Sequence, residues 1–157
     1  MHTVSRSTVQ AFYEAYVSVD ADRVEPFLDD NVDWMISGPV DVLAFCGQHR
    51  GKAAVLKLFD RVFPGVFEEA AFEPQSLLVD GDRAALLFVL SGVAREHRRK
   101  VSYRVAHFLR FRDSKVVKFR SIIDSFDAAE QVLGHAIDVS QHETASDLTA
   151  AGDLIAV

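Results

Sequence analysis

Residues 116–134 read VVKFRSIIDSFDAAEQVLG, a β-rich run that ends in an acid and passes directly into a helix. The first half is rich in β-branched and aromatic residues, which fit a half-buried pleated surface and predict a strand. In the second half, Asp127 and Glu130 have the spacing of a capping box and Gly134 is a typical stop, so a short helix is predicted. Asp124 lies between the two, where an acid can serve in catalysis or simply shape the turn.

The strand in this stretch is predicted to be the last of four. Alternating apolar residues separated by short polar turns predict strands over 70–79, 84–95, 101–112 and 116–126. Short connections between long strands are typical of an antiparallel meander.

The N-terminal half has helical patterns instead. In chain order, the predicted elements are a helix over 4–19, a shorter helix that begins near Asp22, a strand over 32–36, a loop over 38–50 and a helix that begins at Gly51 and ends at Pro64. Helices followed by an antiparallel sheet predict an α+β domain.

Composition is that of one globular domain. The chain has 157 residues, of which 49% are hydrophobic and 25% charged, close to the globular average. The net charge is −6 and the only basic run, Arg95–Lys100, is short, so nucleic acid is a poor candidate partner. The N-terminus lacks the apolar region of a signal peptide and no segment approaches the length of a membrane span, so no membrane contact is expected.

Cysteine and histidine spacing predicts neither a metal site nor a disulfide. Cys46 is the only cysteine, and a reducing, cytoplasmic setting is therefore expected. No His, Cys, Asp and Glu grouping has metal-ligand spacing, and no phosphate-binding loop or serine-hydrolase elbow is present. We expect no metal and no cofactor.

The last 22 residues differ from the rest. Residues 136–157 are small and polar with a weak apolar set. We therefore expect a domain over 1–135 and a tail over 136–157 that docks on the domain or on a partner subunit.

Element order and three motifs resemble the nuclear transport factor 2-like superfamily, and within it the SnoaL-like and ketosteroid-isomerase-like branch. The motifs are WMISGP from Trp34, GQHRG from Gly47 and IIDSFDAAEQVLG from Ile122. The resemblance covers roughly residues 4–134. It implies a cone-shaped α+β barrel, in which a strongly curved antiparallel sheet wraps around an apolar pocket beneath the N-terminal helices.

The resemblance also implies a function. A small, largely apolar or polyketide-like ligand is expected, with a cofactor-independent isomerase, cyclase or dehydratase activity. Because the superfamily also contains proteins with no known activity, the alternative is a non-catalytic ligand-binding or dimerisation module of the same fold.

The resemblance assigns a role to Asp124. In the polyketide cyclase and limonene epoxide hydrolase branches, an acid at the end of the last long strand transfers protons, and Asp124 matches that place. Epoxide hydrolases pair the acid with Arg-x-Asp on a middle strand, whereas Leu90–Ala94 carries neither charge. Ketosteroid isomerases carry their base near the end of the first strand, where this chain has Ile36 and Ser37. Asp124 is thus expected to act as general acid or base without the relatives' usual partners.

His107 is the candidate partner of Asp124. It falls in the apolar phase of its strand and is expected to face the interior. There it is either a proton-transfer group or a core histidine held by one backbone hydrogen bond. Strict alternation would turn Asp124 outward with the cations of its strand, so a bulge or bend near Ser121 is predicted to turn it inward.

Aromatic residues at helix and strand spacing are either core or pocket lining. The predicted ligand-binding residues are Tyr13, Trp34, Phe59, Phe63, Phe88 and Tyr103. Tyr13 and Trp34 are the stronger candidates, since their polar tips need a partner.

A homodimer is expected from the opposite face of the same sheet. Ala106 and Phe108 place apolar area between flanking arginines, and an apolar patch with a charged rim is typical of an interface.

Overall fold

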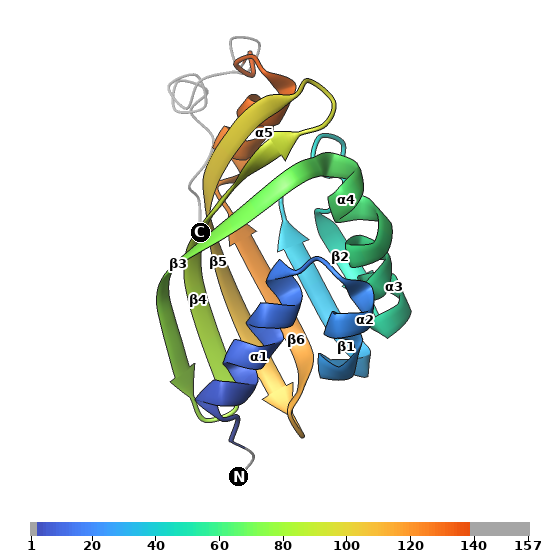
Figure 1. Cartoon of the computed structure of the whole chain (residues 1–157), viewed down its shortest axis with the longest axis vertical. Coiled ribbons are helices and arrows are strands. Elements are labelled where there is room, and N and C mark those ends of the chain that lie inside the picture. The colour runs from blue at the N-terminus through green and yellow to red at the C-terminus, as the bar shows by residue number, and fades with distance from the viewer. Residues whose placement is uncertain (1–2, 139–157) are drawn as a thin grey trace, which may run out of the picture.

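The computed structural model describes residues 3–138 and shows a curved, open six-stranded sheet with α1 lying across one face (Figure 1). The helical elements are α1 (Arg6–Val17), α2 (Ala21–Val24), the 3₁₀ turn η1 (Glu25–Phe27), α3 (Lys52–Lys57), the π-helical turn η2 (Leu58–Val62), α4 (Phe63–Val66) and α5 (Ser125–Leu133). The strands are β1 (Leu28–Ser37), β2 (Gly47–Arg50), β3 (Phe67–Asp80), β4 (Arg83–Ala94), β5 (Arg99–Arg112) and β6 (Lys115–Ile123). The predicted α+β class and curved antiparallel sheet are confirmed.

Strand order in the sheet is β2-β1-β6-β5-β4-β3. Strands β3 to β6 form the predicted antiparallel meander, and β1 joins it in parallel to β6. The expected loop over 38–50 is wrong at its end, because Gly47–Arg50 forms β2 and pairs with β1. Its sequence, GQHR, has no apolar alternation that could have predicted a strand.

The third helix continues past its predicted end. Helix α3 passes into the π-helical turn η2 and then into α4, which contains Pro64. A proline in the first turn of a helix has no intrahelical N–H bond to lose. The interruption by η2 makes Pro64 such a first-turn residue, so the predicted stop is wrong.

The junction from β6 into α5 follows the prediction closely. Gly134 ends α5 in the left-handed conformation, with φ 78°, and its N–H donates to the Glu130 carbonyl oxygen. The helix begins at Ser125, two residues before the expected capping residue Asp127, whose Oδ2 accepts from Gln131 Nε2 at 2.8 Å. Asp124 occupies the N-cap position without a capping hydrogen bond from its side chain.

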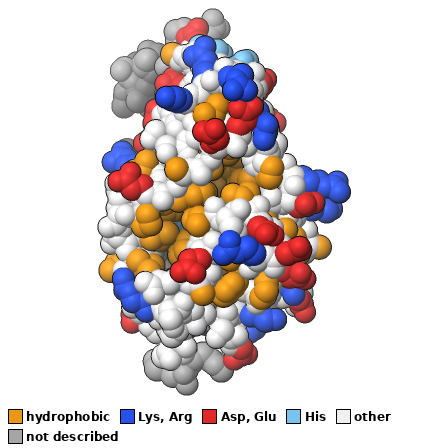
Figure 2. Space-filling view, viewed as in Figure 1, with side chains coloured by type: hydrophobic (Ala, Val, Ile, Leu, Met, Phe, Trp, Pro, Cys, Tyr) orange, Lys and Arg blue, Asp and Glu red, His pale blue; other side chains and the backbone are white. Residues whose placement is uncertain are grey.

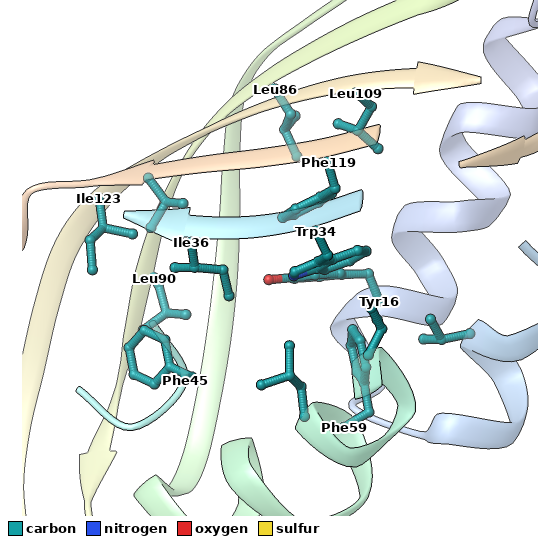
Figure 3. Close-up of a cluster of buried hydrophobic side chains, with 14 of the residues drawn as sticks. Tyr16, Trp34, Ile36, Phe45, Phe59, Leu86, Leu90, Leu109, Phe119 and Ile123 are labelled. Atoms are coloured by element: carbon teal, nitrogen blue, oxygen red, sulfur yellow. The ribbon is translucent and has the colours of Figure 1, made fainter. Parts of the chain in front are cut away.

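An aromatic stack joins β1, β6 and α1 in the core. Figure 3 shows Phe119 lying over Trp34, with ring centroids 3.5 Å apart and planes 6° from parallel. The register of β1 on β6 places these residues side by side. Tyr16 stacks against both rings, and Phe59 meets Trp34 edge-on. Trp34 is fully buried, and its Nε1 has no hydrogen-bond partner among the described residues.

The helices leave part of the concave face of the sheet uncovered. Figure 2 shows hydrophobic side chains gathered around a hollow on the face that carries α1 and β3. Over residues 3–138, no helix has the length and apolar character needed to cross a membrane. From residue 139 onward the predicted tail lies outside the described residues, so its docking stays a prediction.

Candidate functional site

A cavity of about 320 Å³ lies between the sheet, the C-terminal end of α1, and α4. Its wall is mainly apolar and aromatic and includes Phe45, Phe59, Phe63, Phe67, Phe72 and Leu90. This volume is near the lower end of the range for small-molecule sites. The space therefore suits a compact apolar compound.

Two cross-strand neighbours bring polarity to the sheet side of the cavity. His107 on β5 pairs with Ser121 on β6, and both side chains line the wall. Apart from core tyrosines, Trp34 and Cys46, they are the two polar side chains that are buried within residues 3–138. A single row of the sheet thus concentrates its buried polar groups at this site.

Two tyrosines add hydroxyl groups to the wall. Tyr16 from α1 and Tyr103 from β5 both line the cavity and are almost fully buried. Neither hydroxyl makes a hydrogen bond to any residue in the described part of the chain. Burial raises the pKa of both phenols, and the nearby Tyr16 adds to the rise at Tyr103. Both hydroxyls therefore keep their protons and can donate hydrogen bonds.

His107 is enclosed by aromatic rings. Its ring lies 4.5 Å from that of Phe119, 4.8 Å from Phe88 and 5.2 Å from Tyr16, centroid to centroid. Nδ1 forms a long hydrogen bond of 3.4 Å with the Tyr13 hydroxyl, while Nε2 is buried and has no partner within residues 3–138. Burial lowers the pKa of His107 to about 3. The imidazole is therefore neutral at pH 7 and a weak base.

Charged groups occur at the edge of the cavity. Glu68, the extra residue of a bulge in β3, lines the wall together with Arg95. Arg95 and Arg98 lie 3.6 Å and 3.0 Å from Glu68 Oε1, and Arg95 Nε also donates to the Pro64 carbonyl oxygen at 2.6 Å. These contacts connect β3 to the β4–β5 turn and to α4.

The predicted ligand-binding residues divide into two groups. Phe59, Phe63 and Tyr103 line the cavity, as does His107. The remaining three, Tyr13, Trp34 and Phe88, pack behind the wall and contact it through their rings.

Asp124 lies outside the cavity. Its carboxylate is 41% exposed and lies 3.5 Å from Arg104 Nη2 on the outer face of the sheet. The predicted bend near Ser121 is wrong, because the pairing of β5 with β6 is regular from Phe119 to Ile123. The bulge in β6 falls earlier, at Val117, and leaves Asp124 in the outward phase. Asp124 and His107 therefore do not converge.

Replacing Asp124 with asparagine is expected to change stability by no more than about 0.5 kcal/mol, because exposed ion pairs contribute little. Binding of a ligand in the cavity should also be unchanged. Asp33→Asn is the matched control on the same face. Because Asp33 accepts hydrogen bonds from Arg120 and Gln48, its replacement should lower the free energy of unfolding more than Asp124→Asn does. Urea unfolding and calorimetric binding measure both effects. Loss of ligand binding in Asp124→Asn would show that Asp124 takes part in the binding site and would contradict this prediction.

Tyr16 and Ser121 belong to the site, although sequence reasoning did not select them. Ser121 falls in the buried phase of β6 between Phe119 and Ile123, the same signal that identified His107. Tyr16 shares the apolar face of α1 with Tyr13. Tyr16, which is nearer the C-terminal end of the helix, lines the cavity, whereas Tyr13 packs behind its wall. In both cases, a polar group on the buried face of its element is the sequence feature that could have identified the residue.

No set of side chains suggests a bound metal ion. Among the described residues, no three His, Cys, Asp or Glu side chains lie close enough together to hold one. Cys46 is buried, and burial raises the pKa of its thiol to about 11.

Open sheet, helices and cavity together define a protein of the nuclear transport factor 2-like fold. Residues 9–119 match the model of the SnoaL-like domain, and the chain belongs to this family. Among curated proteins, none matches the chain.

Solved structures agree with the fold. A candidate isomerase from Rhodopseudomonas palustris is 29% identical, with a TM-score of 0.73 over 84% of this chain and 100% of its own. An NTF2-like protein from Burkholderia xenovorans LB400 is 22% identical, with a TM-score of 0.70 over 80% and 93%. An LEH-like epoxide hydrolase from M. tuberculosis is 19% identical, with a TM-score of 0.64 over 82% and 88%. At these lower identities the likeness concerns the fold alone.

Proposed function

We propose that this protein binds a small, uncharged, largely apolar compound in the cavity and holds one oxygen atom of it with the hydroxyls of Tyr16 and Tyr103. The observation that carries the proposal is the pair of unbonded phenol groups on an otherwise apolar wall. Buried hydroxyl groups normally find a partner. A carbonyl or ether oxygen of a ligand would supply it.

The wall favours a neutral ligand. Transferring an ionised group into an apolar cavity is costly unless a charge of opposite sign pairs with it. The charges at the edge of the cavity, Glu68 and Arg95, already contact each other. Besides these charges, the polar side chains that line the cavity within the described part of the chain are those of Tyr16, Ser18, Tyr103, Ser121 and His107, all of them neutral at pH 7.

A cofactor-independent isomerase, cyclase or dehydratase is the second candidate. Phenol donors could stabilise negative charge that develops on a ligand oxygen during proton transfer. Such a reaction also needs a base, and Glu68 is the one carboxylate on the wall within the described chain. Arg95 and Arg98 already bind it. The geometry therefore supports binding better than it supports catalysis, and a polyketide-like ligand remains compatible with both.

A matched pair of probes tests the proposed contact. Titration calorimetry with 1-tetralone and with tetralin, the same skeleton without the carbonyl group, should show tighter binding of the ketone. One net hydrogen bond contributes about 1 kcal/mol, so the expected preference is about fivefold. In Tyr103→Phe and in Tyr16→Phe the preference should shrink, while the affinity for tetralin stays near its original value.

Tyr13→Phe is the control for this experiment. Its hydroxyl bonds His107 behind the wall, so the preference for the ketone should persist. Equal affinities of the wild-type chain for the two probes would contradict the proposed contact. Failure of both probes to bind would contradict the pocket itself. A preference that survives in Tyr16→Phe and Tyr103→Phe would assign the contact to Ser121 or His107.

A further inference from the structure

We infer that Val19 is a ligand-contacting residue, held in a strained backbone conformation so that its side chain closes the rim of the cavity beside Tyr16. This role rests on the proposed function, because it requires an apolar compound in the cavity. It adds that the apolar skeleton of this compound reaches the C-terminal end of α1.

The end of α1 and the residues that follow it form part of the rim of the cavity. Val17, Ser18 and Val19 line the cavity one after another, and none of the three is buried. Figure 2 shows the hollow on the face of the molecule that carries α1. Tyr16, which lies directly before this segment, is almost fully buried and is one of the two proposed hydrogen-bond donors. Val19 is therefore placed to contact a ligand that this donor holds.

Val19 has a backbone conformation that its residue type disfavours. Its φ is 53°, in the left-handed region. There the Cβ atom of an L-residue crowds the backbone, and a β-branched residue at positive φ is a genuine outlier. Residues held in such conformations destabilise the fold and are concentrated at ligand-binding and active sites. The strain at Val19 therefore indicates a role for its side chain.

The other left-handed residues have an ordinary explanation. Within residues 3–138, the remaining non-glycine residues with positive φ are Arg98, Asp113 and Ser114. All three lie in the hairpin turns β4–β5 and β5–β6, where tight connections commonly require positive φ. None of the three lines the cavity. Val19 differs from them both in its β-branched side chain and in its place at the cavity.

The end of α1 does not itself require a valine. The Val19 N–H donates to the Tyr16 carbonyl oxygen at 3.1 Å, and helices that end in this way usually have glycine or asparagine at this position. Helix α5 follows that rule with Gly134, whose φ is 78°. Because the bond to Tyr16 uses only backbone atoms, Val19→Gly would keep it. What valine adds is the side chain that lines the cavity.

Titration calorimetry with tetralin and 1-tetralone tests the contact. In Val19→Gly both affinities should fall by about fivefold, the loss expected when one or two methylene-sized contacts disappear. The preference for the ketone should not change, because a valine side chain makes no hydrogen bond. Tetralin binding as tight in Val19→Gly as in the wild type, or no binding of either probe to the wild type, would overturn the inference.

The same titrations separate this inference from the proposed hydrogen bond. Equal affinities of the wild type for the two probes would contradict the contact of the ketone with Tyr16 and Tyr103. The contribution of Val19 would still be measured by tetralin alone, and a weaker affinity of Val19→Gly for tetralin would support it.

Thermal unfolding tests the strain. Val19→Ala shortens the same side chain but keeps a Cβ atom in the left-handed region, so it should bind tetralin nearly as weakly as Val19→Gly. Glycine lacks the crowded Cβ, so Val19→Gly should unfold roughly 2–4 °C above Val19→Ala. This order is the reverse of the usual one, in which alanine is the more stabilising of the two. A higher Tm for Val19→Ala would show that the position is unstrained and would overturn the inference.

Ser114→Gly is the matched control. Ser114 has a φ of 64° in the β5–β6 turn and does not line the cavity. Its Tm should exceed that of Ser114→Ala in the same way, while the affinities for both probes stay at their wild-type values. Weaker tetralin binding in Ser114→Gly would show that relief of strain anywhere in the chain reduces affinity, and would overturn the assignment of the contact to Val19.

Discussion

Substituting Trp34 with alanine is expected to lower the free energy of unfolding by about 3–5 kcal/mol, the usual cost of removing a large buried aromatic ring. Trp34 is fully buried and contacts Phe119 face to face, with Tyr16 and Phe59 around it. The loss would leave a void between β1, β6 and α1, where three elements distant in sequence meet. Urea unfolding at pH 7 measures the change.

Phe126→Ala is the control for Trp34→Ala. Phe126 is 54% exposed on α5, so its removal should change stability by no more than about 0.5 kcal/mol. Trp34→Ala should also bind a ligand in the cavity more weakly, because Tyr16 packs against the indole and would lose its position on the wall. A Trp34→Ala chain as stable as the wild type would contradict the packing described here.

The second large effect concerns His107 and pH. In the folded chain burial lowers the pKa of His107 to about 3, compared with 6.5 without burial. Between these values the unfolded chain binds a proton that the folded chain does not. The contribution of His107 to the free energy of unfolding is therefore greatest above pH 6.5. It falls as the pH drops towards 3, by up to about 1.4 kcal/mol per pH unit.

His107→Phe removes this group and should flatten the pH dependence. The variant should gain stability relative to the wild type by up to about 1.4 kcal/mol for each unit below pH 6. Unfolding in urea at pH 7, 6, 5 and 4 measures the difference, and two-state behaviour should be checked at each pH. Replacing His97, which is exposed in the β4–β5 turn, should leave the slope as in the wild type. Parallel curves for His107→Phe and the wild type would show that the imidazole titrates normally.

Local chemistry was sufficient to predict most elements of the fold. Alternation of apolar residues defines β4, β5 and β6 closely, and Gly134 ends α5 as expected. Three features were not predictable from local patterns. Strand β2 has no apolar alternation, β1 lies parallel to a strand some 85 residues later, and Pro64 is tolerated only because η2 resets the helix before it.

The site was predictable only where strand phase is strict. His107 and Ser121 are polar residues in buried phases, and alternation alone faces both inward. The expectation for Asp124 required a bulge at one particular residue, and β6 has its bulge at Val117 instead. Bulge positions depend on the curvature of the whole sheet, which no short stretch encodes. Depth along α1, which separates Tyr16 from Tyr13, likewise depends on how the helix docks.

The stack of Trp34, Phe119 and Tyr16 gives the protein a built-in optical reporter. Trp34 is the sole tryptophan of the chain, so the indole emission comes from a single, fully buried environment. Tyr16 touches the indole on one side and lines the cavity on the other. Emission intensity and wavelength can therefore follow both unfolding and occupancy of the cavity, without any attached dye.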